Sequence, residues 1–185
     1  MKRLIALIFI TSLFGCNNSN TKNTDTGTTS KPEFINQAYE AISLSGDTLR
    51  SKAPSEELIK RFTAKKEAFE LESNNIENII WLGRFTAYMG NYLEAIEIYS
   101  EALKKYPNDA RLYRHRGHRY ITIRAFDKAI LDLTRAADLI KGKENQIEED
   151  GMPNAQNIPV STLHGNIYYH LGLAYYLIDE KEASV

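Results

Sequence analysis

Residues 76–109 read IENIIWLGRFTAYMGNYLEAIEIYSEALKKYPND, and residues 110–143 read ARLYRHRGHRYITIRAFDKAILDLTRAADLIKGK. The second segment repeats the first with a period of 34 residues. Small residues recur at this step: Gly83 as Gly117, Ala95 as Ala129, and Ala102 as Ala136. A fixed period of this kind is typical of stacked helical hairpins, because each hairpin buries its apolar face only against its neighbours. We therefore predict an all-α fold.

The first helix of each predicted hairpin carries a spaced motif, which in the second copy is Tyr113-x2-Arg116-Gly117-x2-Tyr120. This pattern resembles the tetratricopeptide (TPR) repeat, whose first helix carries W-x2-L-G-x2-Y. The resemblance implies a TPR-like α-solenoid of antiparallel helix hairpins, with about seven helices. Each motif glycine is expected where the paired helix crosses closest, since a side chain there would push the two helix axes apart.

The segments on either side of the repeats read as further helices and a loop. Apolar residues recur at helical spacing over residues 34–44, which predicts one helix. Ser55 is the expected cap of a second helix that runs to about Glu72. We divide the chain as follows: a signal peptide (1–15), a disordered tether (16–31), N-terminal capping helices (32–75), two TPR-like repeats (76–143), an inserted loop (144–164), and the first helix of an incomplete third repeat (165–185).

The N-terminus carries an export signal. Lys2 and Arg3 precede an apolar run from Leu4 to Phe14, and Gly15 and Cys16 follow it. The run is shorter than the roughly 20 residues that span a membrane, but it suits a secretory signal. The ending Leu-Phe-Gly-Cys resembles a bacterial lipoprotein box, which implies that Cys16 is lipidated and becomes the mature N-terminus. An ordinary signal peptide with an incidental cysteine is the alternative.

The composition limits the kinds of binding partner and of covalent cross-link that we expect. The net charge of −1 does not favour nucleic acid, and the single cysteine excludes an internal disulfide. We expect a protein in the bacterial cell envelope, lipid-anchored to a membrane through Cys16 and facing the periplasm, with no cofactor.

The densest chemical feature is a basic stretch from Arg111 to Arg124. In TPR proteins the second, fifth, ninth, twelfth and thirteenth positions of each first helix line the concave face. Carried over to this sequence, those positions include the following candidate peptide-binding residues: Arg84, Tyr88, Arg111, Arg114 and His118. Guanidinium groups bind carboxylates in bidentate fashion, so we predict a scaffold that binds a protein or an acidic peptide. The alternative is a solvated basic face that neutralises the acidic inserted loop.

Other functions have weaker support. His115 and His118 suggest a metal pair or a hydrolase-type enzyme, but no third ligand or orienting carboxylate follows from the spacing, so we expect neither a metal nor catalytic residues. An accessory subunit of an envelope complex, completed by a partner helix, is a further alternative. The predicted helix from about Thr162 to Ile178 is apolar enough to suggest a homo-oligomer through the C-terminal helix.

Overall fold

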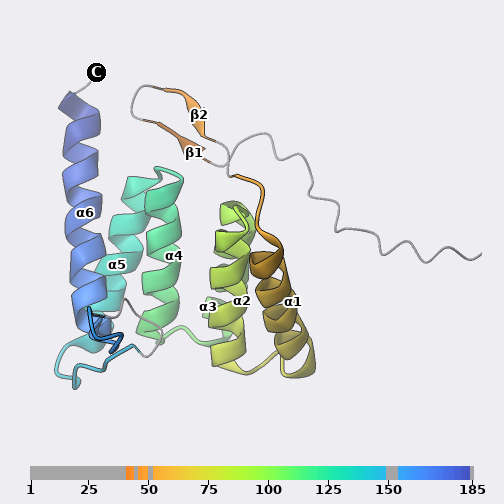
Figure 1. Cartoon of the computed structure of the whole chain (residues 1–185). Coiled ribbons are helices and arrows are strands. Elements are labelled where there is room, and N and C mark those ends of the chain that lie inside the picture. The colour runs from red at the N-terminus through yellow and green to blue at the C-terminus, as the bar shows by residue number, and fades with distance from the viewer. Residues whose placement is uncertain (1–40, 44–45, 50–51, 149–153, 184–185) are drawn as a thin grey trace, which may run out of the picture. The chain divides into compact units, whose positions relative to one another are not determined.

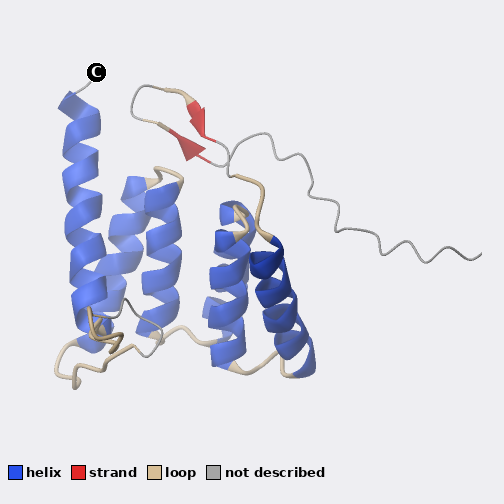
Figure 2. Cartoon of the chain, viewed as in Figure 1, coloured by secondary structure: helices blue, strands red, loops and turns tan. Residues whose placement is uncertain are grey.

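The computed structural model describes residues 41–43, 46–49, 52–148 and 154–183 (Figure 1). The helices in this part are α1 (Glu56–Leu71), α2 (Ile76–Tyr88), α3 (Tyr92–Lys105), α4 (Ala110–Thr122), α5 (Phe126–Ile140) and α6 (Leu163–Ala183). Each helix packs against the next one along the chain, and α6 also packs against α4. Figure 2 shows the successive helices from α1 to α5 joined by short loops and running in opposite directions. The fold is the predicted TPR-like α-solenoid of antiparallel hairpins, with six helices in the described residues.

The helix predicted over residues 34–44 is wrong where the structure describes it. Strand β1 (Ala41–Ile42) pairs antiparallel with strand β2 (Thr48–Leu49). Gly46 closes the hairpin with a φ of +89°, a conformation that glycine adopts without a steric penalty. Turn geometry therefore overrides the helical spacing of the apolar residues. Residues 34–40 lie outside the described part of the chain.

Polar side chains cap the start of α1, α2 and α4, and the cap of α1 is the predicted one. Ser55 caps α1 by accepting a hydrogen bond from the Leu58 amide. Asn75 caps α2, and Asp109 caps α4 by accepting bonds from two backbone amides. Asn75 and Asp109 occupy equivalent places in the two repeats, so the period extends to the residues that satisfy the first free N–H groups of each helix.

The motif glycines lie where the sequence predicts a close helix crossing. A Cβ atom on Gly83 would lie 2.5 Å from Cζ of Tyr99 in α3. A Cβ atom on Gly117 would lie 2.8 Å from Cγ of Leu133 in α5. Both partner side chains are fully buried, so neither has space to move aside. This prediction is confirmed at both positions.

A buried ion pair joins three helices of the two repeats. Arg116 of α4 donates to both carboxylate oxygens of Asp132 in α5, at 2.7 and 2.8 Å. It also donates to Ser100 Oγ in α3 at 3.0 Å. Only 6% of Asp132 is exposed. The bidentate contact satisfies a carboxylate that would otherwise be costly to bury.

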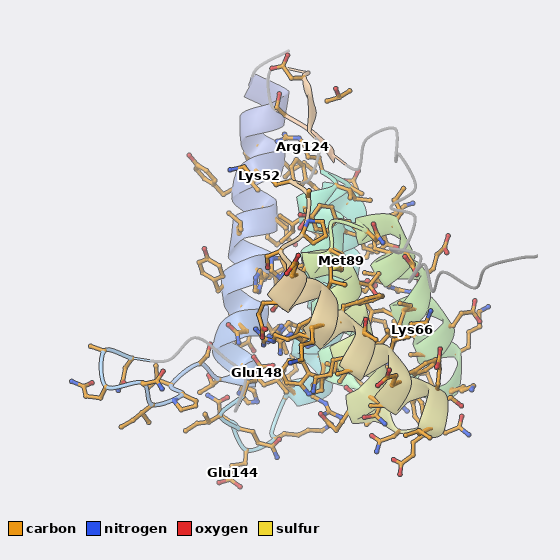
Figure 3. All side chains as sticks on the ribbon, turned by 45° about the vertical axis from the view of Figure 1, so that its right-hand side comes forward. Lys52, Lys66, Met89, Arg124, Glu144 and Glu148 are labelled. Atoms are coloured by element: carbon orange, nitrogen blue, oxygen red, sulfur yellow. The ribbon has the colours of Figure 1, made fainter. Side chains whose placement is uncertain are left out.

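The described residues between α5 and α6 (141–148 and 154–162) form a loop, and α6 begins at Leu163, within the predicted inserted loop (144–164). Within its described part, Ile147 and Thr162 form an isolated antiparallel bridge. The Glu148 amide donates to the Ser161 carbonyl at 2.8 Å. Figure 3 labels Glu148 beside the end of α6 where that helix starts. The loop therefore folds back onto the helices.

The last helix, α6, packs by one side only. Ile167 and Ala174 are fully buried against α5, while about half of Tyr168 and Tyr175 is exposed. A Cβ atom on Gly172 would meet no heavy atom within 4 Å. The motif that fills a helix crossing in the two repeats therefore faces open space in α6. Self-association through this helix stays a prediction.

Candidate functional site

A groove crosses one face of the helices and consists of two adjoining hollows. The larger, which we call the basic hollow, encloses about 830 Å³. It is lined by Arg61, Trp81, Arg84, Tyr88, Tyr99, Arg114, His115, His118, Arg119, Ser161, Asn166, Tyr169 and His170. The smaller, the paired hollow, encloses about 530 Å³ and is lined by Glu77, Ile80, Trp81, Arg111, His115, Gln146, Ile147, Glu148 and Leu163. Trp81 and His115 line both hollows, so the two adjoin at these side chains.

The candidate residues from the sequence all line this groove. Arg84, Tyr88, Arg114 and His118 lie in the basic hollow, and Arg111 lies in the paired hollow. Helices α2 and α4 therefore contribute all five residues to two adjoining hollows. That they bind a peptide stays a prediction.

Arg111 is engaged by acidic side chains of its own chain. Its Nη2 lies 2.9 Å from Oδ2 of Asp109, the residue that caps α4, and its Nη1 donates to Glu77 of the preceding repeat. Burial opposes the Arg111 charge, but the hydrogen bonds to Asp109 and Glu77 outweigh burial and raise its pKa. Two carboxylates of its own chain therefore neutralise the charge of Arg111 in the paired hollow.

Arg114 is buried and binds the inserted loop. Its guanidinium pairs with the Glu148 carboxylate, and Asn166 of α6 donates to the same oxygen. Its other terminal nitrogen contacts Nδ1 of His115 at 3.1 Å. Nε of Arg114 is buried without a hydrogen-bond partner among the described residues. Burial lowers the pKa of Arg114 even though Glu148 opposes that shift.

The histidines of the basic hollow are held in fixed tautomers. Arg119 Nη2 contacts Nδ1 of His118 at 2.7 Å, and Arg114 contacts Nδ1 of His115. Arginine only donates, so each Nδ1 accepts, and each neutral imidazole carries its proton on Nε2. His170 is the reverse case, since its Nδ1 lies 2.6 Å from the Asn166 carbonyl and must donate.

Burial and the arginine charges keep these histidines neutral. Burial, followed by the charge of Arg119, lowers the pKa of His118 to about 2. Burial also lowers the pKa values of His115 and His170, and nearby arginines add to both shifts. A general base works best with a pKa near the operating pH and with an orienting carboxylate. The Nδ1 atoms here contact arginines or a backbone carbonyl, so this geometry gives the enzyme hypothesis no support.

Positive charge gathers in the basic hollow. Arg61, Arg84, Arg114 and Arg119 line it, whereas no carboxylate does so in the described part of the chain. Aromatic rings hold several of these guanidinium groups: Arg84 lies 4.6 Å from the Trp81 ring centroid, and Arg61 lies 4.9 Å from that of Phe85. Guanidinium groups stacked on rings keep their charge and are restrained in orientation.

Part of this site was not predicted from the sequence. Arg61 comes from α1, outside the recognised repeats, and Asn166 comes from α6. The His118 and His170 ring centroids lie 4.1 Å apart, which reflects the contact between α4 and α6. Because α6 follows the inserted loop, its position against α4 and α5 does not follow from the 34-residue period. Arg119 was visible in the basic stretch, but its repeat position is not one of those that line TPR grooves.

The described residues were compared with the requirements of a metal site and of a membrane-spanning helix. Among the residues with described positions, no group of three or more His, Cys, Asp or Glu side chains could hold a metal ion. No described helix is both long enough and apolar enough to cross a membrane. The signal peptide (1–15), the tether (16–31) and Cys16 lie outside the described residues.

Comparisons with known proteins give little beyond this geometry. No protein-family model matches the chain, and no curated protein matches it. Among solved structures, the chain is similar to PcrH from Pseudomonas aeruginosa, with 14% sequence identity and a TM-score of 0.42. The match covers 67% of this chain and 96% of PcrH. A similarity this low carries no argument about function, so the candidate site rests on the geometry of this chain.

Proposed function

We propose that the chain is a membrane-tethered helical-repeat scaffold that binds an acidic segment of another protein in the groove. The observation that carries this proposal is the contact between Arg114 and Glu148. An irregular segment of the chain enters the groove and places a carboxylate on a buried guanidinium. The groove thus already holds the kind of group that we expect a partner to supply.

Charge supports the same ligand. The basic hollow is lined by Arg61, Arg84 and Arg119 as well as by Arg114, and exposed Tyr88 adds an aromatic surface next to Arg84. An acidic segment that enters from the side of Glu148 would meet these guanidinium groups in turn. Charge-assisted hydrogen bonds of this type are stronger than neutral ones and favour carboxylates over amides.

The membrane anchor belongs to the proposal as well. The sequence around Cys16 resembles a lipoprotein box, and residues 17–30 have the polar composition of a flexible tether. The scaffold would then work at the bacterial envelope, on the periplasmic side, and would capture its partner close to the membrane.

A fluorescent oligoglutamate peptide tests the binding proposal. The full chain in detergent should bind this peptide, with an affinity that falls as salt rises, because screening acts over about 8–10 Å near physiological ionic strength. Arg84→Glu should weaken binding by about tenfold or more, since it reverses one charge in the basic hollow. Lys104→Glu is the matched control, because Lys104 is exposed on α3 and lines neither hollow.

Equal binding by both variants would show that the groove is not the binding surface. Circular dichroism of each variant checks that helicity is retained. Oligolysine of the same length should not bind, and comparable binding of oligolysine would also contradict the proposal.

A further inference from the structure

The two described ends of the inserted loop pair with each other as a short antiparallel ladder. The Glu148 amide donates to the Ser161 carbonyl at 2.8 Å, and the Leu163 amide donates to the Gln146 carbonyl at 3.0 Å. The isolated bridge of the loop lies between these two hydrogen bonds. Residues 146–148, which we call the built-in segment, are therefore extended, and all three line the paired hollow.

One side chain supplies most of the burial of the built-in segment. Gln146 and Ile147 are exposed, and 60% of Ile147 is open to solvent. The Glu148 side chain is only 11% exposed, because it contacts Arg114 and Asn166. Segments with few buried apolar contacts and with backbone hydrogen bonds near the surface open locally at low free-energy cost. The Glu148 side chain is therefore the main contact that an incoming chain has to replace.

Glu148 engages only part of the Arg114 guanidinium. Nη2 of Arg114 pairs with one carboxylate oxygen of Glu148, and Nη1 contacts His115. Nε is buried without a hydrogen-bond partner among the described residues, and only 8% of Arg114 is exposed. Nε and Nη2 lie on the same edge of a guanidinium group, and a carboxylate that binds both forms a bidentate pair. A carboxylate that is free to orient itself therefore satisfies a buried donor that Glu148 leaves unsatisfied.

The burial of Arg114 favours exchange of one carboxylate for another. Loss of Glu148 alone would leave a buried charge without its partner, which is strongly destabilising. Replacement of Glu148 by a carboxylate of another chain keeps the charge of Arg114 paired. The contact is therefore suited to a competition between an internal and an external acidic segment.

We propose that the built-in segment is an internal competitor for the partner, and that the partner presents an extended segment of the same kind. The incoming segment has an apolar residue followed by an acidic one, as Ile147 and Glu148 are here. Its backbone pairs with residues 161–163, its carboxylate binds both Nε and Nη2 of Arg114, and Glu148 is released. The inference rests on the proposed function of the groove, and it names the conformation of the acidic segment and the contact that regulates its binding.

Fluorescence anisotropy of labelled peptides with the full chain in detergent tests the competition. The probe is Glu-Asn-Gln-Ile-Glu, copied from residues 144–148, and the matched peptide ends in Gln instead of Glu. Both peptides are labelled at the N-terminus and amidated at the C-terminus, so that only the last side chain differs. The matched peptide should bind Glu148→Gln about tenfold or more weakly than the probe does, because it lacks the charge that pairs with Arg114.

We expect Glu148→Gln to bind the probe at least about tenfold more tightly than the wild type does. The reason is that a tethered competitor acts at an effective concentration on the order of mM, and the substitution weakens it. Glu144→Gln is the matched control, because Glu144 is exposed and lines neither hollow. Figure 3 shows Glu144 at the outer side of the loop, away from Glu148. This control should change the affinity for the probe by less than about twofold.

Hydrogen exchange of the wild type distinguishes displacement of the built-in segment from binding elsewhere. When the probe takes its place, the Glu148 amide loses the Ser161 carbonyl and should exchange faster at saturation. The Leu163 amide should stay protected, because the probe supplies a carbonyl in place of that of Gln146. This measurement requires no substitution, so it decides the question should Glu148→Gln fail to fold.

Three results would each overturn the competition. They are equal affinity of the wild type and Glu148→Gln for the probe, equal binding of the two peptides, and unchanged exchange of the Glu148 amide at saturation.

The oligoglutamate assay separates this inference from the proposed function. Oligoglutamate binding of equal strength by the wild type and Glu148→Gln overturns the competition and leaves the scaffold function standing. Binding of the probe without oligoglutamate supports the competition and shows that the groove does not select acidic segments by charge alone. Failure of both ligands with both proteins overturns both proposals.

Discussion

Gly83 and Gly172 occupy the same position of the repeat motif but meet different surroundings. An added Cβ on Gly83 would overlap the Tyr99 ring, whose hydroxyl also reaches the Ile80 carbonyl at 3.4 Å. An added Cβ on Gly172 would meet nothing within 4 Å. The same substitution at both positions therefore distinguishes two effects. At Gly83 the added methyl group overlaps a neighbouring helix, whereas at Gly172 only the low helix propensity of glycine is changed.

We predict that Gly83→Ala destabilises the fold by about 1–3 kcal/mol, because it overfills a close helix crossing. Gly172→Ala should stabilise it by up to about 1 kcal/mol, because alanine is the better helix former and has space here. Urea denaturation of both variants gives the two free energies. A loss of stability at position 172 equal to that at position 83 would contradict the helix pairing.

His118 makes the stability of the fold depend on pH. Burial and the charges of Arg119, His170, Arg114 and Arg84 lower its folded pKa to about 2, against an unfolded value near 6.5. Between these values the unfolded state binds a proton that the folded state does not. The free energy of unfolding therefore falls as pH falls below about 6.5, and the loss continues towards pH 2.

We predict that His118→Gln flattens this dependence between pH 7 and pH 5. One histidine contributes a slope of at most about 1.4 kcal/mol per pH unit well below its unfolded pKa. Urea denaturation at a series of pH values measures the slope for the wild type and the variant. Equal slopes would mean that His118 titrates alike in the folded and unfolded states. His115 and His170 have lowered pKa values too, so a residual slope is expected.

At the scale of elements, the repeat period predicted helices α2 to α5. It did not predict the β1–β2 hairpin or the contacts of the inserted loop. Equivalent caps, glycines and alanines of the two repeats lie 34 residues apart, so the period alone predicts where they occur. The β1–β2 hairpin instead depends on a positive φ at Gly46, which competes with helical spacing. The inserted loop was predicted from its length, but its contact with Arg114 depends on tertiary docking, which no local pattern encodes.

The Arg116–Asp132 pair is the polar link between elements whose loss should be most costly. We predict that Arg116→Ala lowers the free energy of unfolding by about 3–5 kcal/mol, because it leaves the buried Asp132 carboxylate without its partner. Arg135→Ala is the control, since Arg135 makes an exposed hydrogen bond to Asn108, and it should cost less than about 1 kcal/mol. Chemical denaturation compares the two. If both variants lower the free energy of unfolding by similar amounts, the buried pair contributes no more to stability than an exposed hydrogen bond.

At the scale of the whole molecule, the sequence placed the groove but not its full charge. Helical register put Arg84, Arg111, Arg114 and His118 on one face, because residues three and four apart on a helix are neighbours. It did not show that Glu148 pairs with Arg114. The pairing of Glu148 with Arg114 agrees with the alternative in which the basic face neutralises the inserted loop. Binding of a peptide by this face stays a prediction.

The lipid anchor that the sequence predicts at Cys16 lies outside the described residues, and it stays a prediction about the whole chain. If Cys16 carries acyl chains, each buried methylene contributes about 0.8 kcal/mol to membrane binding, and several chains together hold the protein stably. The polar residues that follow would let the repeats reach away from the surface without a packed linker.

We predict that Cys16→Ser moves the protein from the membrane fraction to the soluble fraction, or leaves it as an unprocessed precursor. The physical reason is that serine lacks the thiol that accepts the first lipid group. Thr11→Ser is the control, because it changes the apolar run slightly and keeps the cysteine. Fractionation followed by mass measurement of the mature N-terminus reads out both outcomes. Unchanged membrane association of a normally processed Cys16→Ser protein would show that something other than a lipid on Cys16 holds this scaffold at the membrane.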